Sequence, residues 1–231
     1  NVRKKNILIM MNNLPVGGIA KALLSLLAEI DYEHYNVDVG LFEHTGLFMD
    51  SLPKQVNLLP PLFIKENIEV KPFSNCKKQF KNGLKNGFRC VHYFVKYSFI
   101  RAFTGRENFY YHYCKDQVKN TIDLEKEYDA VVAFASQHVI YYAVDKVKAK
   151  KKIGFIHNDY SKSDYRYYKI DKEYFNKLDY LATISDECVK VLKDYFPDLK
   201  DKIICIPNIV SCDYIENLSK EYYPEEMSDK D

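Results

Sequence analysis

The stretch NILIMMNNLPVGGIAKALLSLLAE, residues 6–29, decides the fold class. It runs from five apolar residues through a polar turn to Gly17-Gly18 and then into a leucine-rich segment. A buried strand, a glycine turn and a helix in this order form the first half of a β-α-β unit. Glycine lets another molecule approach the main chain closely, and the next helix points free N–H groups at that place. The stretch therefore predicts a Rossmann-like start with a candidate phosphate site at the glycines.

The glycine turn is not specific by itself. The chain has neither G-x-G-x-x-G nor the P-loop pattern, so a tight turn without a ligand explains Gly17 and Gly18 equally well. Lys21 follows them and would bring a cation to a diphosphate. A lysine on a helix surface is the simpler interpretation of that residue.

Strand and helix patterns alternate along the rest of the chain. Apolar runs predict strands at 35–42, 56–59, 128–134, 152–156, 180–184 and 202–206, with helices near 108–122, 139–144, 172–178 and 185–195. This alternation predicts an α/β fold, a doubly wound Rossmann-like parallel sheet covered on both faces. Such sheets bind ligands at the carboxyl ends of their strands. Polar residues follow the expected strands there: Asn12-Asn13, Ser136-Gln137, His157-Asn158-Asp159, Ser185 and Asn208.

Composition excludes wholesale disorder, because 47% of the 231 residues are hydrophobic and 29% are charged. The net charge of +2 is unevenly distributed. Residues 70–106 contain no Asp or Glu and nine cations: Lys71, Lys77, Lys78, Lys81, Lys85, Arg89, Lys96, Arg101 and Arg106. The remainder therefore carries +2 − 9 = −7. One basic segment lies in an otherwise acidic chain.

A helix over 78–102 would separate this segment into two faces. One face carries Lys78, Lys81, Lys85, Arg89, His92 and Lys96, and the opposite one carries Phe80, Leu84, Val91, Phe94, Val95 and Ala102. Attachment of residues 71–106 to an anionic membrane surface is one interpretation. A solvated face on a packed helix is the slightly preferred one. Nucleic acid is not expected as a partner, because no recognised motif accompanies the charge.

No sequence pattern indicates a metal or a cofactor, and none is expected. Its six cysteines form no C-x-x-C pair, and no apolar run approaches the ~20 residues that span a bilayer. No signal peptide is evident at the start. These features indicate a cytoplasmic protein, peripheral at the inner face of the membrane if the basic segment binds there.

Four ordered segments also resemble a known family. After the opening GG turn come YDAVVAFAS, IGFIHNDY, YLATISDECVKVLKD and KIICIPNIV. In this order they resemble the N-terminal domain of the retaining GT-B glycosyltransferases of family 4, or group 1. The resemblance covers essentially the whole chain. It implies a GT-B N-terminal, acceptor-side domain over 1–210 and an interdomain link or truncated end over 211–231. The family's C-terminal donor domain is not within these residues, so the resemblance implies that the isolated chain is inactive.

The resemblance also implies roles for single residues. Gly17 and Gly18 would lie beside the diphosphate of a nucleotide-sugar, which is a substrate and not a cofactor. His157 matches a histidine of the catalytic cleft, and Asp159, with Asn158 before it, matches an acidic position of the same loop. Ser185 and Asn208 match small polar positions near the cleft. Ala20 departs from the family, which often has Glu there.

Several of these residues have structural alternatives. His157 could be a satisfied loop histidine, and Asp159 could cap the next helix. In the aromatic stretch 160–168, Tyr167 could stack on a sugar and Arg166 could meet an anionic acceptor. A mobile surface loop is the preferred interpretation of that stretch. His34, His44, His92, His112 and His138 form no evident constellation and are interpreted as structural.

The resemblance favours an enzyme that, at full length, moves a sugar from a nucleotide-sugar to a glycan or lipid-linked acceptor in bacterial surface polysaccharide synthesis. The alternative is a non-catalytic module that docks on a membrane or partner through 71–106. Another GT-B enzyme, such as a nucleotide-sugar epimerase, would share the fold.

Overall fold

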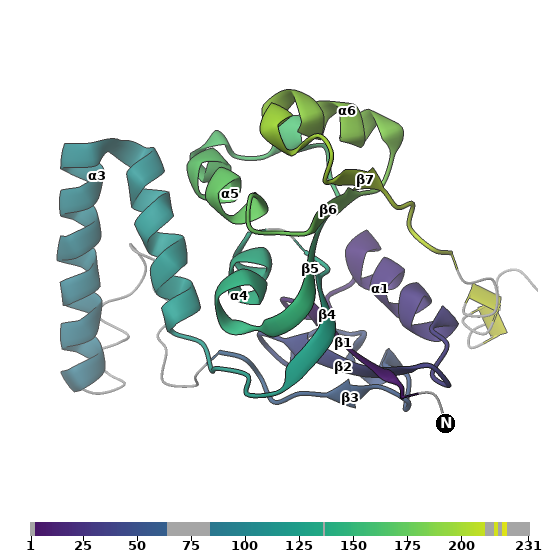
Figure 1. Cartoon of the computed structure of the whole chain (residues 1–231). Coiled ribbons are helices and arrows are strands. Elements are labelled where there is room, and N and C mark those ends of the chain that lie inside the picture. Colours follow the sequence, from purple (N-terminus) through teal and green to yellow (C-terminus); the bar gives the residue numbers. More distant parts are fainter. Residues whose placement is uncertain (1–2, 64–83, 136, 211–214, 217–218, 221–231) are drawn as a thin grey trace, which may run out of the picture.

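Seven parallel strands form one sheet in the computed structural model (Figure 1), which describes residues 3–63, 84–135, 137–210, 215–216 and 219–220. The strand order is β3-β2-β1-β4-β5-β6-β7. The strands are β1 (Lys5–Met11), β2 (Tyr35–Leu41), β3 (Asn57–Leu58), β4 (Glu127–Ala133), β5 (Lys148–Ile156), β6 (Tyr180–Thr183) and β7 (Ile203–Cys205). The chain builds the sheet outward from β1 in one direction, then returns to β4 and builds in the other. The predicted doubly wound parallel α/β fold is confirmed.

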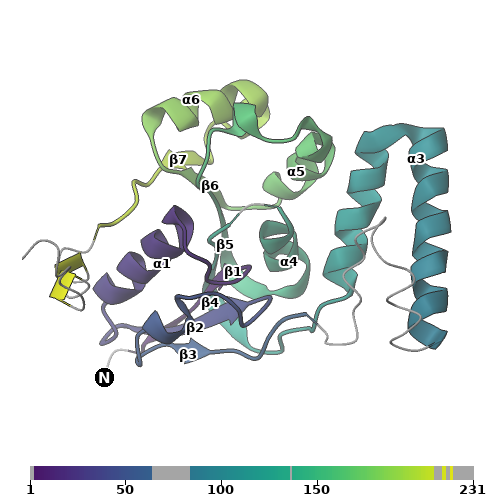
Figure 2. The same ribbon diagram turned by 180° about the vertical axis from the view of Figure 1, so that it is seen from behind.

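Helices cover both faces of the sheet. Helix α1 (Gly18–Glu29) lies on one face, and α4 (His138–Lys146) and α5 (Tyr168–Phe175) lie on the other (Figure 2). Helix α6 (Asp186–Tyr195) packs beside β7. The central strands are therefore apolar on both sides, as neighbouring Leu8 and Ile9 show by being 0% and 2% exposed. The direction of winding reverses between β1 and β4, which is where such folds bind ligands.

Tyrosine hydroxyls satisfy several carboxylates inside the protein. Asp38, on β2, is 3% exposed and accepts hydrogen bonds from Tyr128 Oη (2.7 Å), Lys126 Nζ (2.9 Å) and Asn57 Nδ2 (3.0 Å). Asp171 is equally buried and accepts from Tyr141 and Tyr160. A buried carboxyl group is costly unless it is hydrogen-bonded, and these tyrosine hydroxyls supply the hydrogen bonds. Part of the chain's high tyrosine content is therefore structural.

The basic segment continues into α3 (Leu84–Lys119), a two-part helix that bends at Gly105, where φ is 87°. Its two halves lie side by side as an arm beside α4 and α5 (Figure 1). Tyr97 in the first half packs on Phe109 and Tyr113 of the second, with ring centroids 5.4 and 5.9 Å apart. Tyr97 and Phe109 form a small buried cluster of their own, and Tyr113 packs against both this cluster and the main core.

The arm reverses the expected orientation of the basic segment. Lys96, assigned to the solvated stripe, is half-buried and paired with buried Asp116 of the second half. Val91 and Val95, assigned to the opposite, apolar side, are 40% and 60% exposed. Over 91–102 the expectation of a packed apolar face and a solvated basic face is therefore wrong for these three residues, although His92 of the basic face is exposed as expected. The reason is tertiary: the first half packs against its own continuation, through tyrosines, and not against the sheet. Lys71, Lys77, Lys78, Phe80 and Lys81, and most of 211–231, lie outside the described residues.

Candidate functional site

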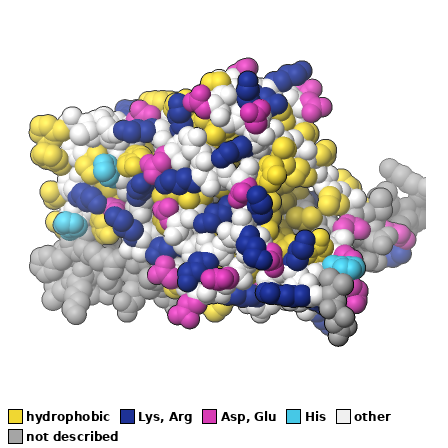
Figure 3. Space-filling view, in the orientation of Figure 1, with side chains coloured by type: hydrophobic (Ala, Val, Ile, Leu, Met, Phe, Trp, Pro, Cys, Tyr) yellow, Lys and Arg dark blue, Asp and Glu magenta, His cyan; other side chains and the backbone are white. Residues whose placement is uncertain are grey.

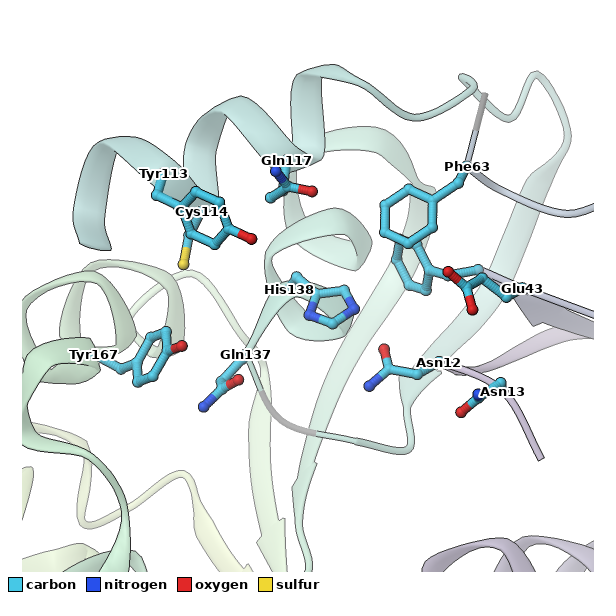
Figure 4. Close-up of a pocket in the computed structure, with 11 residues that line it drawn as sticks. Asn12, Asn13, Glu43, Phe63, Tyr113, Cys114, Gln117, Gln137, His138 and Tyr167 are labelled. Atoms are coloured by element: carbon cyan, nitrogen blue, oxygen red, sulfur yellow. The ribbon is translucent and has the colours of Figure 1, made fainter. Parts of the chain in front are cut away.

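A cavity of about 270 Å³ opens at the carboxyl ends of β1, β2 and β4, beside the point where the winding reverses (Figure 4). The loop after β1 supplies Asn12 and Asn13, and the segment leading into α4 supplies Gln137 and His138. The second half of α3 supplies Tyr113, Cys114 and Gln117 from the opposite wall. Phe42, Glu43, Phe63 and Tyr167 complete the lining.

The loop after β2 fixes the loop that carries Asn12 and Asn13. The backbone N–H of Leu14 donates to the carbonyl of Thr45, and Asn13 Nδ2 donates to Thr45 Oγ1 at 3.1 Å. Gly46 allows this contact, because its φ is +117° and a Cβ there would lie 1.9 Å from the Leu14 carbonyl oxygen. The first wall of the cavity is therefore held by two adjacent strand-end loops.

Two buried polar atoms, on residues that line the cavity, have no hydrogen-bond partner among the described residues. They are Asn12 Oδ1 and Gln117 Nε2. One is an acceptor and the other a donor, and buried groups of this kind normally have a partner. A hydroxyl group can donate to the first and accept from the second. The cavity therefore suits a ligand that carries hydroxyl groups.

His138 gives the cavity a neutral polar centre. Its ring lies edge-on to Phe42 at 5.0 Å and nearly parallel to Phe63 at 6.2 Å. Burial lowers the pKa of His138 from 6.5 to about 4, because the charged form loses its water. At pH 7 the ring therefore offers one donor and one acceptor and no charge. The interpretation of His138 as merely structural missed its place in the cavity.

His157 lies outside this lining, at the end of β5. Its ring stacks on Phe155 and packs against Phe134, and neither ring nitrogen has a hydrogen-bond partner among the described residues. Burial lowers the pKa of His157 to about 4. Asn208 and the Phe134 backbone lie near enough to oppose this shift, but they do not outweigh it. The structure thus brings together His157 and Asn208, two of the residues selected from sequence.

The glycine turn stands open at the start of α1. Gly17 precedes the helix with an extended backbone (φ 174°), and a Cβ on either glycine would meet nothing within 4 Å. Neither unusual dihedrals nor crowding therefore requires glycine here. What the two glycines do provide is free space at the start of α1, so that a ligand can approach the helical N–H groups. Lys21 is exposed, and its ammonium group has no partner within the described part of the chain.

The other candidate residues use their polar groups locally. Ser185 Oγ accepts from the N–H of Cys188 and caps α6, as the sequence indicated. Asp159 accepts from the N–H of Ser161 and caps a short 3₁₀ turn, which matches its structural alternative. Asn158 donates to Ser163 Oγ, and Arg166 is paired with Asp164 and stacked over Tyr110.

The aromatic stretch 160–168 divides its residues between core and surface. It forms two 3₁₀ turns, Tyr160–Lys162 and Tyr165–Tyr167. Tyr160 is 6% exposed and hydrogen-bonded to Asp171, whereas Tyr165 is 70% exposed. Tyr167 lines the cavity. A surface loop therefore describes Tyr165 but not Tyr160.

The sequence missed Gln117 and Tyr113. Both lie on a helix whose sequence contains no motif for a binding site. They come close to Asn12 only because the second half of α3 returns over the end of the sheet. Gln137 was visible as a strand-end residue. Among the described residues, no group of three His, Cys, Asp or Glu side chains lies close enough to hold a metal ion.

Comparison with known proteins gives no independent identification. No family model matches the chain, and no curated protein is significantly similar to it. A function therefore has to be argued from the fold and from the geometry of the cavity.

Proposed function

We propose that this chain is the acceptor-side domain of a retaining glycosyltransferase that transfers a sugar from a nucleotide-sugar to a glycan or lipid-linked acceptor in bacterial surface polysaccharide synthesis. The unpartnered pair in the cavity, Asn12 Oδ1 and Gln117 Nε2, carries the proposal. Sugar hydroxyls can donate to the first atom and accept from the second, and Phe42, Phe63 and Tyr167 supply aromatic surfaces on which sugar rings pack.

The donor would lie farther along the same edge of the sheet. Its diphosphate would meet the N–H groups at the start of α1, in the open space before Gly17 and Gly18. Negative charge develops on that diphosphate as the bond to the sugar breaks, and the helix terminus stabilises it. His157, neutral at pH 7, would donate or accept a hydrogen bond and would not act as a cation.

Gln117→Leu tests the cavity, because it keeps the bulk of the side chain and removes the unpartnered donor. The chain, carrying a fluorescent label, is screened on a glycan array. The glycan that binds most strongly is then titrated into the unlabelled chain by calorimetry. We expect the affinity of Gln117→Leu to be lower by roughly tenfold, which corresponds to one lost hydrogen bond. Asn36→Ala is the control, because the Asn36 amide is exposed at the amino end of β2, away from the cavity, and donates to Asn6.

Two outcomes would contradict the proposal. If Gln117→Leu bound the glycan as tightly as the unchanged chain, the glycan would bind outside the cavity. Binding of no glycan at all would favour the docking module. Because the family places most donor contacts in a second domain, the purified 231 residues are expected to transfer no sugar, and detectable transfer would require a different mechanism.

A further inference from the structure

The first half of α3 exposes a continuous apolar face along the outside of the arm. Val91, Val95, Phe99 and Phe103 are 40%, 60%, 62% and 72% exposed, and their spacing of four residues places them along one side of the helix. Hydrophobic side chains gather at the left edge of the molecule in Figure 3, where Figure 1 places this half of α3. Scattered exposed apolar residues are normal, but a row of them along one helix is a mark of an interaction surface.

Within the described part of the arm, no packing contact covers most of the surface of this apolar row. The inner side of the same helix packs through Tyr93, Tyr97 and Ile100 on the second half of α3. The rings of Phe99 and Phe103 lie 4.3 Å apart on the outer side, where most of their surface faces solvent. The helix is therefore amphipathic with its more apolar residues outward, which is the reverse of a helix that packs only on its own domain.

The charges beside the row are positive. No Asp or Glu occurs anywhere in residues 70–106. At the bend of the arm, Arg101, Arg106 and Arg166 surround a hollow of about 160 Å³ together with Phe109 and Tyr110. Arg166 is paired with Asp164, and the other charged side chains that line the hollow are the two arginines of α3. The partner of this surface is therefore expected to be apolar and negatively charged.

We propose that the first half of α3 lies in the surface of an anionic lipid bilayer, with Val95, Phe99 and Phe103 among the acyl chains and Arg101 and Arg106 at the lipid phosphates. An interfacial helix combines an apolar side with flanking cations in this way. A second copy of the chain is a poorer partner for the row, because residues 70–106 of that copy would bring the same cations and no carboxylate. No helix in the described part of the chain is long and apolar enough to cross a membrane.

Lipid binding would place the two halves of α3 between the bilayer and the cavity. The second half of α3 packs on the membrane-bound half and carries Tyr113 and Gln117 into the cavity. An acceptor anchored in the same bilayer would therefore extend its glycan past the two halves of α3 to reach the cavity. This consequence rests on the proposed function, whereas the attachment itself does not.

Vesicle flotation of the 231-residue chain tests the attachment. Phosphatidylglycerol–phosphatidylcholine vesicles are compared with pure phosphatidylcholine vesicles at low and high salt. We expect flotation with the anionic vesicles and a decrease with salt. Phe99→Ser combined with Phe103→Ser should lower the partition coefficient by roughly tenfold or more, because two buried phenyl rings are lost. Val91→Ser with Val95→Ser is a second variant on the same row.

Leu47→Ser combined with Tyr165→Ser is the matched control. These two side chains are 80% and 70% exposed and lie outside α3, so their loss should leave flotation unchanged. Arg106→Gln should weaken binding to the anionic vesicles and leave binding to the neutral ones as it was.

Three outcomes would overturn the proposal. One is that the unchanged chain does not float with anionic vesicles. Another is that both serine pairs on α3 float as well as the control. The third is a dimer in solution that the serine pairs convert to a monomer, which would make the row a contact between copies. Glycan titration is a separate measurement, so a failure of the proposed function would be distinguishable from a failure of the attachment.

Discussion

The imidazole of His157 lies flat against the ring of Phe155, with centroids 4.3 Å apart and 9° between the planes. Phe134 covers a second side at 4.4 Å. The two rings exclude water from the imidazole, and this burial lowers the pKa of His157 from 6.5 to about 4. A histidine at the end of a central strand is therefore held neutral and without a hydrogen-bond partner in the described structure.

Acid should weaken the fold through this ring. The unfolded state binds the proton near pH 6.5 and the folded state only near pH 4, so the free energy of unfolding falls as pH is lowered between these values. His157→Leu removes this effect. Its loss of stability from pH 7 to pH 4.5 should be smaller than that of the unchanged chain by roughly 1–2 kcal/mol. Urea unfolding at both pH values measures the difference.

Asp171 acts in the opposite direction. Burial raises its pKa to about 6, so the folded state binds its proton before the unfolded state does, and acid stabilises the fold through this group. Asp171 is present in both proteins and cancels in the comparison. His112→Leu is the matched control, because His112 is exposed on α3. Equal acid sensitivity of the His157 and His112 variants would contradict the prediction.

Tyr128→Phe should destabilise the protein by about 2 kcal/mol. The change keeps the packing of the ring but removes a hydrogen bond of 2.7 Å to Asp38, a carboxylate that is 3% exposed. Lys126 and Asn57 still hold Asp38, so the fold should survive. Tyr165→Phe, on the surface, should cost almost nothing. Thermal unfolding of both variants checks this prediction, and a cost at Tyr128 no larger than at Tyr165 would argue against it.

Gly18→Ala should separate stability from nucleotide binding. Gly18 is the first residue of α1, and a Cβ there meets nothing within 4 Å, so alanine should stabilise the helix by roughly 0.5 kcal/mol. The added methyl group would project into the space that the proposal gives to the diphosphate. Titration with UDP-glucose as the probe should show weaker binding by the more stable variant. Unchanged affinity would leave the glycines as a turn without a ligand.

Local patterns predicted the sheet well because its strands are local features. The apolar run in residues 7–11 and the glycine turn after it needed no distant contact to be recognised. Boundaries were less certain: α5 begins at Tyr168, although the pattern indicated 172–178, because the preceding 3₁₀ turn continues directly into it. Ser185 was predictable as a cap for the same local reason, since its hydroxyl binds a backbone group only three residues away.

The second wall of the cavity was not predictable from local patterns. Gln117 reaches the cavity only because α3 bends at Gly105 and returns along α4. The same bend explains why Val95 faces outward: the first half of α3 packs on Tyr113 and Phe109, which the bend at Gly105 brings back against it. Amphipathic pattern identifies the two sides of a helix, but the tertiary fold decides which side is covered.

Gln137 combines backbone strain with a place in the cavity. It is the non-glycine residue with positive φ in the described structure (φ 61°, ψ −125°), and its side chain does not cap α4. Such a backbone costs about 1–2 kcal/mol in any residue with a Cβ, and glycine adopts it freely. Gln137→Gly should therefore raise the free energy of unfolding by about 1 kcal/mol and weaken glycan binding. Gln137→Ala removes the same amide but keeps the strain, so it should bind glycan as weakly without gaining stability. Urea unfolding and glycan titration of both variants test this prediction. Equal stability of the glycine and alanine variants would show that the backbone at Gln137 is not strained. Unchanged glycan affinity in both variants would show that Gln137 does not belong to the site.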